Sequence, residues 1–182
     1  MQALTALQQR VSSPLLAEPA PSQEQLQQIF SAALRAPDHG ALTPWRFLTI
    51  ADEARQKLAD VMTAAKEAED APKHMLLKAQ KAPFRAPMII VVIASIQEGR
   101  IPGFEQEHSA AAAAQNILVA AEALGLGAIW RTGWPTHHPD VLEALSVSEH
   151  EKIIGFIYIG QRCGERRTIA PLSVDDYVQE WI

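Results

Sequence analysis

The sequence predicts a single α+β domain in which about four short strands form one central sheet covered by helices. Residues 88–94 and 153–159 are almost continuously apolar, which is typical of central strands covered on both faces. Residues 105–124 instead carry small and apolar side chains at the three-and-four spacing of a helix face. The chain of 182 residues is long enough for one domain with a sizeable core, and we find no internal repeat and no second domain.

Composition narrows the class of protein before any site is considered. The chain is 48% hydrophobic and 20% charged, an ordinary globular balance, and its net charge of -5 provides no basic face for nucleic acid or an anionic membrane. The single Cys163 excludes an intramolecular disulfide and a CxxC pair. No stretch approaches the ~18 apolar residues of a membrane span, and the N-terminus lacks a basic region followed by an apolar run. We therefore expect a soluble, cytoplasmic protein.

Two helices are predicted before residue 40. The first covers residues 3–9 and stops before Pro14, which cannot continue a helix. Ser22 and Gln25 form a capping box that begins the second helix. Its amphipathic face consists of Leu26, Ile29, Phe30, Ala33 and Leu34.

The next elements lead into the first apolar run. We expect a strand at residues 46–50, a helix that starts at Asp52, and a short helix at residues 72–81. A charged stretch, residues 66–70, precedes the second of these helices, and its acidic residues Glu67, Glu69 and Asp70 are predicted to be solvated surface, so paired-carboxylate chemistry is not expected there. After the glycine-rich junction described below, a short helix is expected to end at Leu145.

Two segments in the N-terminal half combine a cation with a second polar group. Arg10 and Ser12 follow the first helix, and the fixed donor fork of arginine suits a phosphate or a polarised ligand edge. The alternative is a charge that complements the helix dipole. Arg35 and His39 flank a turn, where the histidine is either a ligand contact or an idle surface group that lacks a partner to fix its tautomer.

The junction after the long central helix is the best candidate for a ligand-binding strand. Gly125 occupies a helix C-cap position, and Gly127 begins a strand, so these glycines form a helix-to-strand turn. A dinucleotide fingerprint has the opposite polarity, from strand into helix. The strand ends in Arg131, Thr132 and Gly133, which point to ligand binding unless Arg131 makes only a surface ion pair.

Several common sites are excluded by spacing. The adjacent His137 and His138 lack the convergent donors that a zinc site needs, so no metal is expected. There is no GxSxG elbow, no P-loop and no Cys/His nucleophile pair. Beyond residue 160 the chain is polar, but Tyr177 and Trp181 imply that residues 161–182 form an extension that docks on something.

Three motifs in register resemble the FMN-dependent nitroreductase family, most closely its compact YdjA type. They are Arg10-x-Ser12, Arg35-Ala-Pro-Asp-His39 before Pro44-Trp45, and Gly125-x-Gly-x-x-Trp-Arg-Thr-Gly133. The resemblance spans nearly the whole chain through Gly160. It implies a nitroreductase-like fold with a mostly antiparallel sheet of about four to five strands. It also implies a homodimer with two FMN sites at the subunit interface. The C-terminal extension, residues 161–182, is then expected to dock on this dimer.

The activity implied by the resemblance is that of an oxidoreductase. NADH or NADPH would reduce the flavin by hydride transfer, and the flavin would pass electrons to a nitroaromatic, a quinone or a related small acceptor by a ping-pong mechanism. The flavin carries out the chemistry, so no catalytic acid or base is required of the protein. The alternatives are a non-catalytic flavin-binding protein and a flavoenzyme of the same fold with other chemistry, such as dehalogenation.

The resemblance also assigns residues. It puts Arg10 and Ser12 on the FMN of their own subunit, and Arg35 and His39 on the FMN of the partner subunit. The residues alongside the flavin would be Arg131, Thr132 and Gly133, and those approaching the nicotinamide nucleotide would be Ala121, Glu122, Ala123, Leu124, Gly125 and Leu126.

The chain departs from the family pattern near its phosphate contacts. Many relatives have basic residues where this chain has Val11 and Pro14, which reduces the flavin contacts available from that loop. Larger relatives carry a basic C-terminal motif that grips phosphate. Its candidates here are Arg162, Arg166 and Arg167, whose spacing does not match that motif cleanly. Trp130 and Trp134 flank the ligand strand as pocket walls or as core residues.

Overall fold

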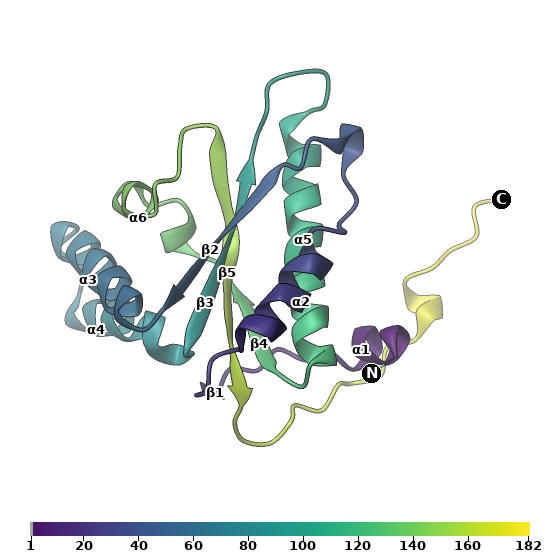
Figure 1. Cartoon of the computed structure of the whole chain (residues 1–182), viewed down its shortest axis with the longest axis horizontal. Coiled ribbons are helices and arrows are strands. Elements are labelled where there is room, and N and C mark those ends of the chain that lie inside the picture. The colour runs from purple at the N-terminus through teal and green to yellow at the C-terminus, as the bar shows by residue number, and fades with distance from the viewer. Residues whose placement is uncertain (1) are drawn as a thin grey trace.

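The computed structural model describes residues 2–182 and contains a five-stranded antiparallel sheet (Figure 1). β5 is the central strand, because it pairs with β3, β4 and β1, and β3 also pairs with β2. The strands are β1 (Leu16–Ala17), β2 (Trp45–Ala51), β3 (Met88–Ser95), β4 (Gly127–Arg131) and β5 (Glu151–Arg162). The predicted α+β class and the antiparallel sheet are confirmed.

Helices cover both faces of the sheet. α2 and α5 lie on one face, whereas α3, α4 and α6 lie on the other (Figure 1). The helices are α1 (Ala3–Gln9), α2 (Gln23–Ala33), α3 (Glu53–Ala68), α4 (Lys73–Lys81), α5 (Gly103–Ala123) and α6 (Pro139–Ala144), and the 3-10 turns are η1 (His39–Ala41), η2 (Ala82–Arg85), η3 (Trp134–Thr136) and η4 (Val174–Asp176). None of these helices is long and apolar enough to cross a membrane, within the described part of the chain.

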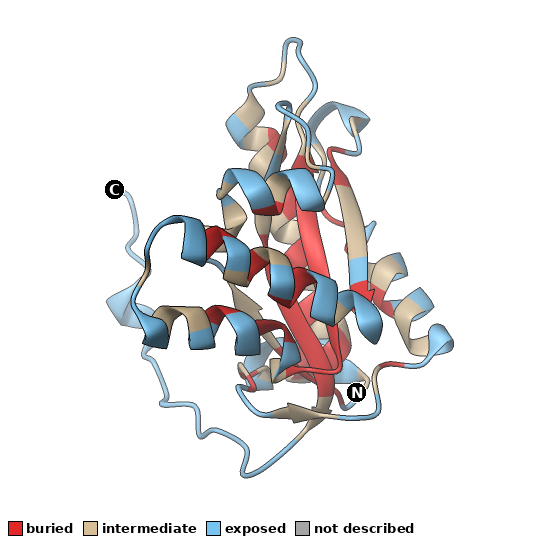
Figure 2. Ribbon diagram, turned by 90° about the vertical axis from the view of Figure 1, so that its left-hand side faces the viewer, coloured by how far each residue is buried: buried red, intermediate tan, exposed pale blue. Residues whose placement is uncertain are grey.

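The two apolar runs are the buried middle of the sheet, as predicted. Successive β3 side chains alternate between the two faces. Ile90 joins the core under α2 and α5, while Ile89 and Val91 join the core under α3, α4 and α6. Figure 2 shows the buried central strands behind helices whose outer faces are exposed.

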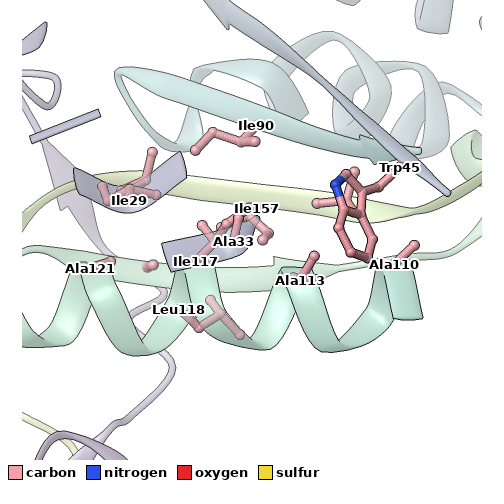
Figure 3. Packing of buried hydrophobic residues seen from close by; sticks show 14 of the residues in the cluster. Ile29, Ala33, Trp45, Ile90, Ala110, Ala113, Ile117, Leu118, Ala121 and Ile157 are labelled. Carbon is pink, nitrogen blue, oxygen red and sulfur yellow. The ribbon is translucent and has the colours of Figure 1, made fainter. Parts of the chain in front are cut away.

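Small residues let α5 approach the sheet closely. Ala110, Ala113 and Ala121 are completely buried, and they lie with Ile117 on the helix face that is turned toward Ile157 of β5 (Figure 3). An alanine side chain contributes little bulk, so the helix axis can come near the strands while the isoleucines fill the remaining space. α5 therefore holds β4 and β5, the two strands beside the predicted ligand site, in fixed positions.

The end of α5 confirms the predicted glycine cap. Gly125 has a φ of 78°, a left-handed conformation that favours glycine. Its N–H donates to the carbonyl of Glu122 at 3.0 Å, and the N–H of Leu126 donates to the carbonyl of Ala121 at 2.9 Å. This pair of bonds is a Schellman motif, and it turns the chain directly into β4.

One strand and one boundary differ from those expected. β1 was not predicted, because a strand of two residues is too short to show alternation. It pairs with Gln161 and Arg162, so these two residues belong to β5. The C-terminal extension therefore begins at Cys163 and not at residue 161.

An ion pair fixes the end of the sheet that lies farthest from Arg162 along β5. Glu151 accepts hydrogen bonds from Arg46 Nε at 2.6 Å and Arg46 Nη2 at 2.8 Å, and others from the Ser95 hydroxyl and the Ser148 N–H. The bond from Arg46 is the main cause of a lowered Glu151 pKa, about 2. Every one of these partners lies in or beside β2, β3 and β5, so the pair stabilises the sheet and is no candidate for ligand chemistry.

Candidate functional site

Two of the three predicted motifs meet along β4. Ser12 forms a β-bridge with Ala128 at one end of the strand, and the N–H of Ser13 donates to the carbonyl of Ala128 at 3.0 Å. Arg131 ends the strand and leads into Thr132. At about 3.3 Å per residue, Ala128 and Arg131 are about 10 Å apart along the strand. Residues separated by more than 100 positions in the sequence therefore flank the two ends of one short strand.

A cavity of about 250 Å³ lies at the Arg131 end of β4, between the sheet and the α3–α4 pair. We call it the Arg131 cavity. Its apolar wall includes Leu58, Met62 and Phe156, and its cationic side chains are Lys78, Arg85 and Arg131. Thr132 and Gly133 also line it, so all three residues predicted to lie alongside a flavin face this space. No carboxylate or histidine belongs to the described lining.

The Arg131 side chain contacts an aromatic ring in this cavity, but one of its hydrogen-bond donors has no acceptor there. Its guanidinium lies 5.6 Å from the ring centroid of Tyr158, within the range of a cation–π contact. Its Nε is buried and has no hydrogen-bond partner among the described residues. Burial raises the pKa of Tyr158, and the charges of Arg85 and Arg131 partly oppose that rise. A ligand with a polar or anionic edge would satisfy the unpartnered Nε–H.

A second cavity, of about 280 Å³, lies at the Ser12 end of β4. We call it the Arg167 cavity. Ser12 and Ile129 line it together with Glu165 and three arginines, which are Arg162 at the end of β5 and Arg166 and Arg167 in the C-terminal extension. Ile129 and Arg131 are two residues apart on β4, so their side chains lie on the same face of the sheet. The two cavities therefore open along one face of β4.

A buried carboxylate organises two of the three arginines. Glu122 is only 4% exposed, and it accepts hydrogen bonds from Arg162 at 2.7 Å and from Arg166 at 2.8 Å. Arg162 also donates to the Ser13 hydroxyl, and Arg166 to the carbonyl of Gln9. Arg167, in contrast, makes no ion pair with any of residues 2–182. It is thus the cation of this cavity that is available to an anionic ligand.

Glu122→Gln is expected to lower the free energy of unfolding by about 2 kcal/mol, since it weakens charge-assisted hydrogen bonds to two arginines. Chemical denaturation would measure the change. The matched control is Glu107→Gln, which removes the pair with Lys152, a residue whose side chain is 63% exposed. Exposed pairs contribute about 1 kcal/mol or less. Equal losses in the two variants would contradict an organising role for Glu122.

Comparison with known proteins decides the family. Residues 7–161 match the sequence profile of the nitroreductase family. The chain belongs to the nitroreductase family. It is 45% identical over 161 residues to the Escherichia coli K12 protein YdjA, which is named as an NAD(P)H nitroreductase, and the match covers 88% of each chain. The predicted family and its YdjA type are confirmed.

Solved structures agree with this fold. A nitroreductase-like protein from Bacillus cereus superposes with a TM-score of 0.84 at 21% identity, covering 98% of this chain and 95% of the other. A nitroreductase from Desulfovibrio desulfuricans, solved in complex with FMN, gives a TM-score of 0.78 at 25% identity, covering 99% of this chain and 96% of the other. The first similarity supports the fold alone, and the second links the fold to a flavin complex.

In this member of the nitroreductase family, the residues expected to approach a nicotinamide nucleotide lie at the end of α5. Ala121 and Leu126 are buried in the core, Glu122 holds the two arginines, and only Ala123 and Gly125 are well exposed. None of the six residues lines the Arg131 cavity. Contact between residues 121–126 and a nicotinamide nucleotide therefore stays a prediction, and their visible contacts are structural.

The remaining predicted residues lie outside both cavities. Arg10 is the half-buried C-cap of α1, and Arg35 is exposed after α2. His39 is exposed in η1, and its Nδ1 lies 2.6 Å from a carboxylate oxygen of Glu105 at the start of α5. Glu105 is thus a partner that can fix the histidine tautomer. Contact of Arg10 with the flavin of its own subunit, and of Arg35 or His39 with the partner subunit's flavin, stays a prediction.

Sequence reasoning missed several side chains of the Arg131 cavity. Lys78 lies on α4, Arg85 ends η2 and Tyr158 belongs to the second apolar run. Their spacing carries no recognisable motif, because they meet only when α4 packs against the sheet. Within residues 2–182, no group of three or more His, Cys, Asp or Glu side chains could hold a metal ion.

Proposed function

We propose that this chain is an FMN-dependent oxidoreductase that accepts hydride from NADH or NADPH and passes electrons to a small acceptor. The observation that carries the proposal is the arrangement along β4. An apolar cavity with cations at its edge lies at one end, and a cationic cavity lies at the other. FMN has the matching construction, because a flat, largely apolar ring is joined through a ribityl chain to a phosphate.

The residues present fit the two ends of this cofactor. A phosphate carries about two negative charges, which suits Ser12 and Arg167 in the Arg167 cavity. The Arg131 cavity offers an apolar wall for the ring and the unpartnered Nε–H of Arg131 for a polar ring edge. The Desulfovibrio desulfuricans relative was solved with FMN, and a further structural neighbour is described as an FMN- and NADPH-dependent nitroreductase.

The protein's own contribution is binding, orientation and electrostatics. When bound, FMN would supply the hydride and electron chemistry. Lys78, Arg85 and Arg131 favour negative charge in the Arg131 cavity, while Leu58 and Phe156 exclude water from it. Because the flavin would carry out the chemistry, the proposed activity requires no general base from the protein.

The acceptor is proposed to be a nitroaromatic, a quinone or a related small molecule. The name of YdjA includes NAD(P)H and nitroreductase, and its sequence similarity covers 88% of this chain. Donor and acceptor would use the same exposed side of one flavin in turn, which is the basis for expecting a ping-pong mechanism. The single free Cys163 is compatible with the cytoplasmic location that we expect.

We also propose a homodimer in which the C-terminal extension docks on a second copy. Residues 163–182 leave the body of the chain as an exposed strap (Figure 1). The strap carries Leu172, Tyr177 and Trp181, each at least 70% exposed, and α1 exposes Leu4 at 69%. So many large apolar side chains on one terminal segment are typical of a surface that another chain covers.

The phosphate assignment predicts how the protein ranks flavins. We expect FMN to bind more tightly than FAD, because FMN ends in a phosphate with about two negative charges, whereas each phosphate of FAD is part of a diester with one. Arg167→Ala should weaken FMN binding by about 1.5–3 kcal/mol, the range for hydrogen bonds to charged groups, and leave riboflavin binding unchanged. Equilibrium dialysis with the three flavins measures this, and Lys57→Ala on the exposed side of α3 is the control. Tighter binding of FAD would contradict the FMN assignment.

A further inference from the structure

Trp134 forms part of the Arg131 cavity at the point where β4 ends. It follows Gly133 directly, begins η3 and is half-buried. Its indole lines the same cavity as Arg131 and Phe156. The sequence alone left this tryptophan as either a pocket wall or a core residue, and its place in the cavity lining identifies it as a wall.

The indole contacts side chains from the end of α3 and from the residue that precedes α6. Lys66 Nζ lies 4.0 Å from the Trp134 ring centroid and 2.6 Å from Glu69 Oε2. The other carboxylate oxygen of Glu69 lies 3.0 Å from His138 Nε2. The His138 ring meets the indole edge-on, at 5.3 Å between centroids and 85° between planes. We call Lys66, Glu69 and His138 the Trp134 clamp.

Burial makes the position of Lys66 informative. The residue is only 7% exposed, and a buried ammonium is costly unless it is paired. Its partners are a carboxylate and the face of an indole, which is the most favourable aromatic partner for a cation. Glu67, Glu69 and Asp70 are exposed, as expected, whereas Lys66 in the same charged run is buried because the end of α3 packs against η3.

A purely structural role would not require this arrangement. Leu58 and Met62 already anchor α3 in the core. Lys66 and His138 both contact the same indole, and that indole also lines the Arg131 cavity. A cation on the ring and an imidazole at its edge restrict rotation of the indole about its side-chain torsions.

We infer that Trp134 contacts the bound flavin ring and that Lys66 is a positioning residue, which fixes this indole through the Trp134 clamp. The inference rests on the proposed function, since it takes FMN as the occupant of the Arg131 cavity. It adds to that function a chain of contacts from a lysine on α3, through an indole, to the cofactor. Loosening the indole should therefore change the environment of the flavin without removing any of its polar contacts.

Fluorescence of bound FMN provides the test, because an indole in contact with a flavin ring quenches its emission. The wild-type complex should be dim, and Trp134→Phe should make it brighter. The matched control is Trp130→Phe: this indole lies on the opposite face of β4, where its N–H donates to the Ile154 carbonyl. Its replacement should leave the complex dim. Tyr158 is present in every variant, so its contribution is constant.

Lys66 is tested by a pair of variants. Lys66→Met keeps the apolar stem and removes the charge, so bound FMN should become brighter and bind about 3- to 10-fold more weakly, within the range of a cation–π interaction. Lys66→Arg keeps a cation over the ring and should restore the wild-type values. Thermal unfolding, measured in parallel, identifies a Lys66→Met chain that has not folded, and the Trp134 variants then decide the inference.

The outcomes separate the inference from the proposed function. Wild-type protein that binds no FMN would contradict the proposed function itself. FMN binding with equal brightness in the Trp134→Phe and Trp130→Phe complexes would overturn the placement of Trp134. A brighter Trp134→Phe complex combined with wild-type values for Lys66→Met would overturn the positioning role of Lys66.

Discussion

A mixed dimer of an Arg10→Glu chain and an Arg35→Glu chain is expected to retain one functional FMN site, whereas each mutant homodimer retains none. If each site takes Arg10 from one subunit and Arg35 from the other, one site of the mixed dimer receives both substitutions. The other site receives neither. Each reversal replaces an attraction with a repulsion, so we expect about 3 kcal/mol or more of lost FMN affinity at every affected site.

Differently tagged chains allow the mixed dimer to be purified and its flavin content to be measured by absorbance. Lys57→Glu, on the exposed side of α3, is the control for a charge reversal outside the proposed site. Both mutant homodimers must fold and assemble, which circular dichroism and size-exclusion chromatography check. If both arginines came from the same subunit, every site of the mixed dimer would carry one substitution. A mixed dimer no better than the homodimers at holding FMN would therefore exclude the shared site.

The sequence alone predicted those elements that are determined by residues close together in the chain. A capping box at Ser22 and Gln25 starts α2, and both of its reciprocal hydrogen bonds are present. The glycine cap at Gly125 ends α5 one residue earlier than the periodic pattern. The continuous apolar runs became β3 and β5 because strands covered on both faces need no polar alternation. In each case the responsible residues lie within a few positions of one another.

The parts that could not be predicted depend on contacts between distant segments. Glu122 lies in the last turn of α5, at a position that the sequence alone does not mark as buried. Arg162 and Arg166 reach it only because the end of the chain folds back against α5. Lys66 belongs to a charged run, yet packing of α3 against η3 buries it beneath Trp134. Buried charges of this kind have no periodic signature, since their partners are supplied by the tertiary fold.

In the candidate site too, residues marked by a local pattern were predicted, whereas residues brought in by the tertiary fold were missed. Arg131, Thr132 and Gly133 were identified because they end a recognisable strand, and the structure places them on a cavity. Lys78 and Arg85 were missed because α4 presents them from another part of the chain. Motif spacing thus located the β4 side of the site. Topology was needed for the opposite wall.

We expect bound FMN to be reduced by a nicotinamide nucleotide and reoxidised by a small acceptor. Protein loaded with FMN should be yellow, because oxidised flavin absorbs visible light. Anaerobic addition of NADPH or NADH should bleach that colour, and a quinone should restore it. The oxidised nucleotide must leave before the acceptor enters if both use one side of the flavin, so each half-reaction should proceed without the other substrate present.

Anaerobic titration of the FMN complex with NADPH and with NADH tests this redox cycle, with free FMN at the same concentration as the control. We predict that the protein-bound flavin is bleached by one equivalent of at least one nucleotide, much faster than free FMN, and that it regains its colour when quinone is added. Protein that takes up FMN but is bleached by neither nucleotide faster than free FMN would contradict an oxidoreductase function.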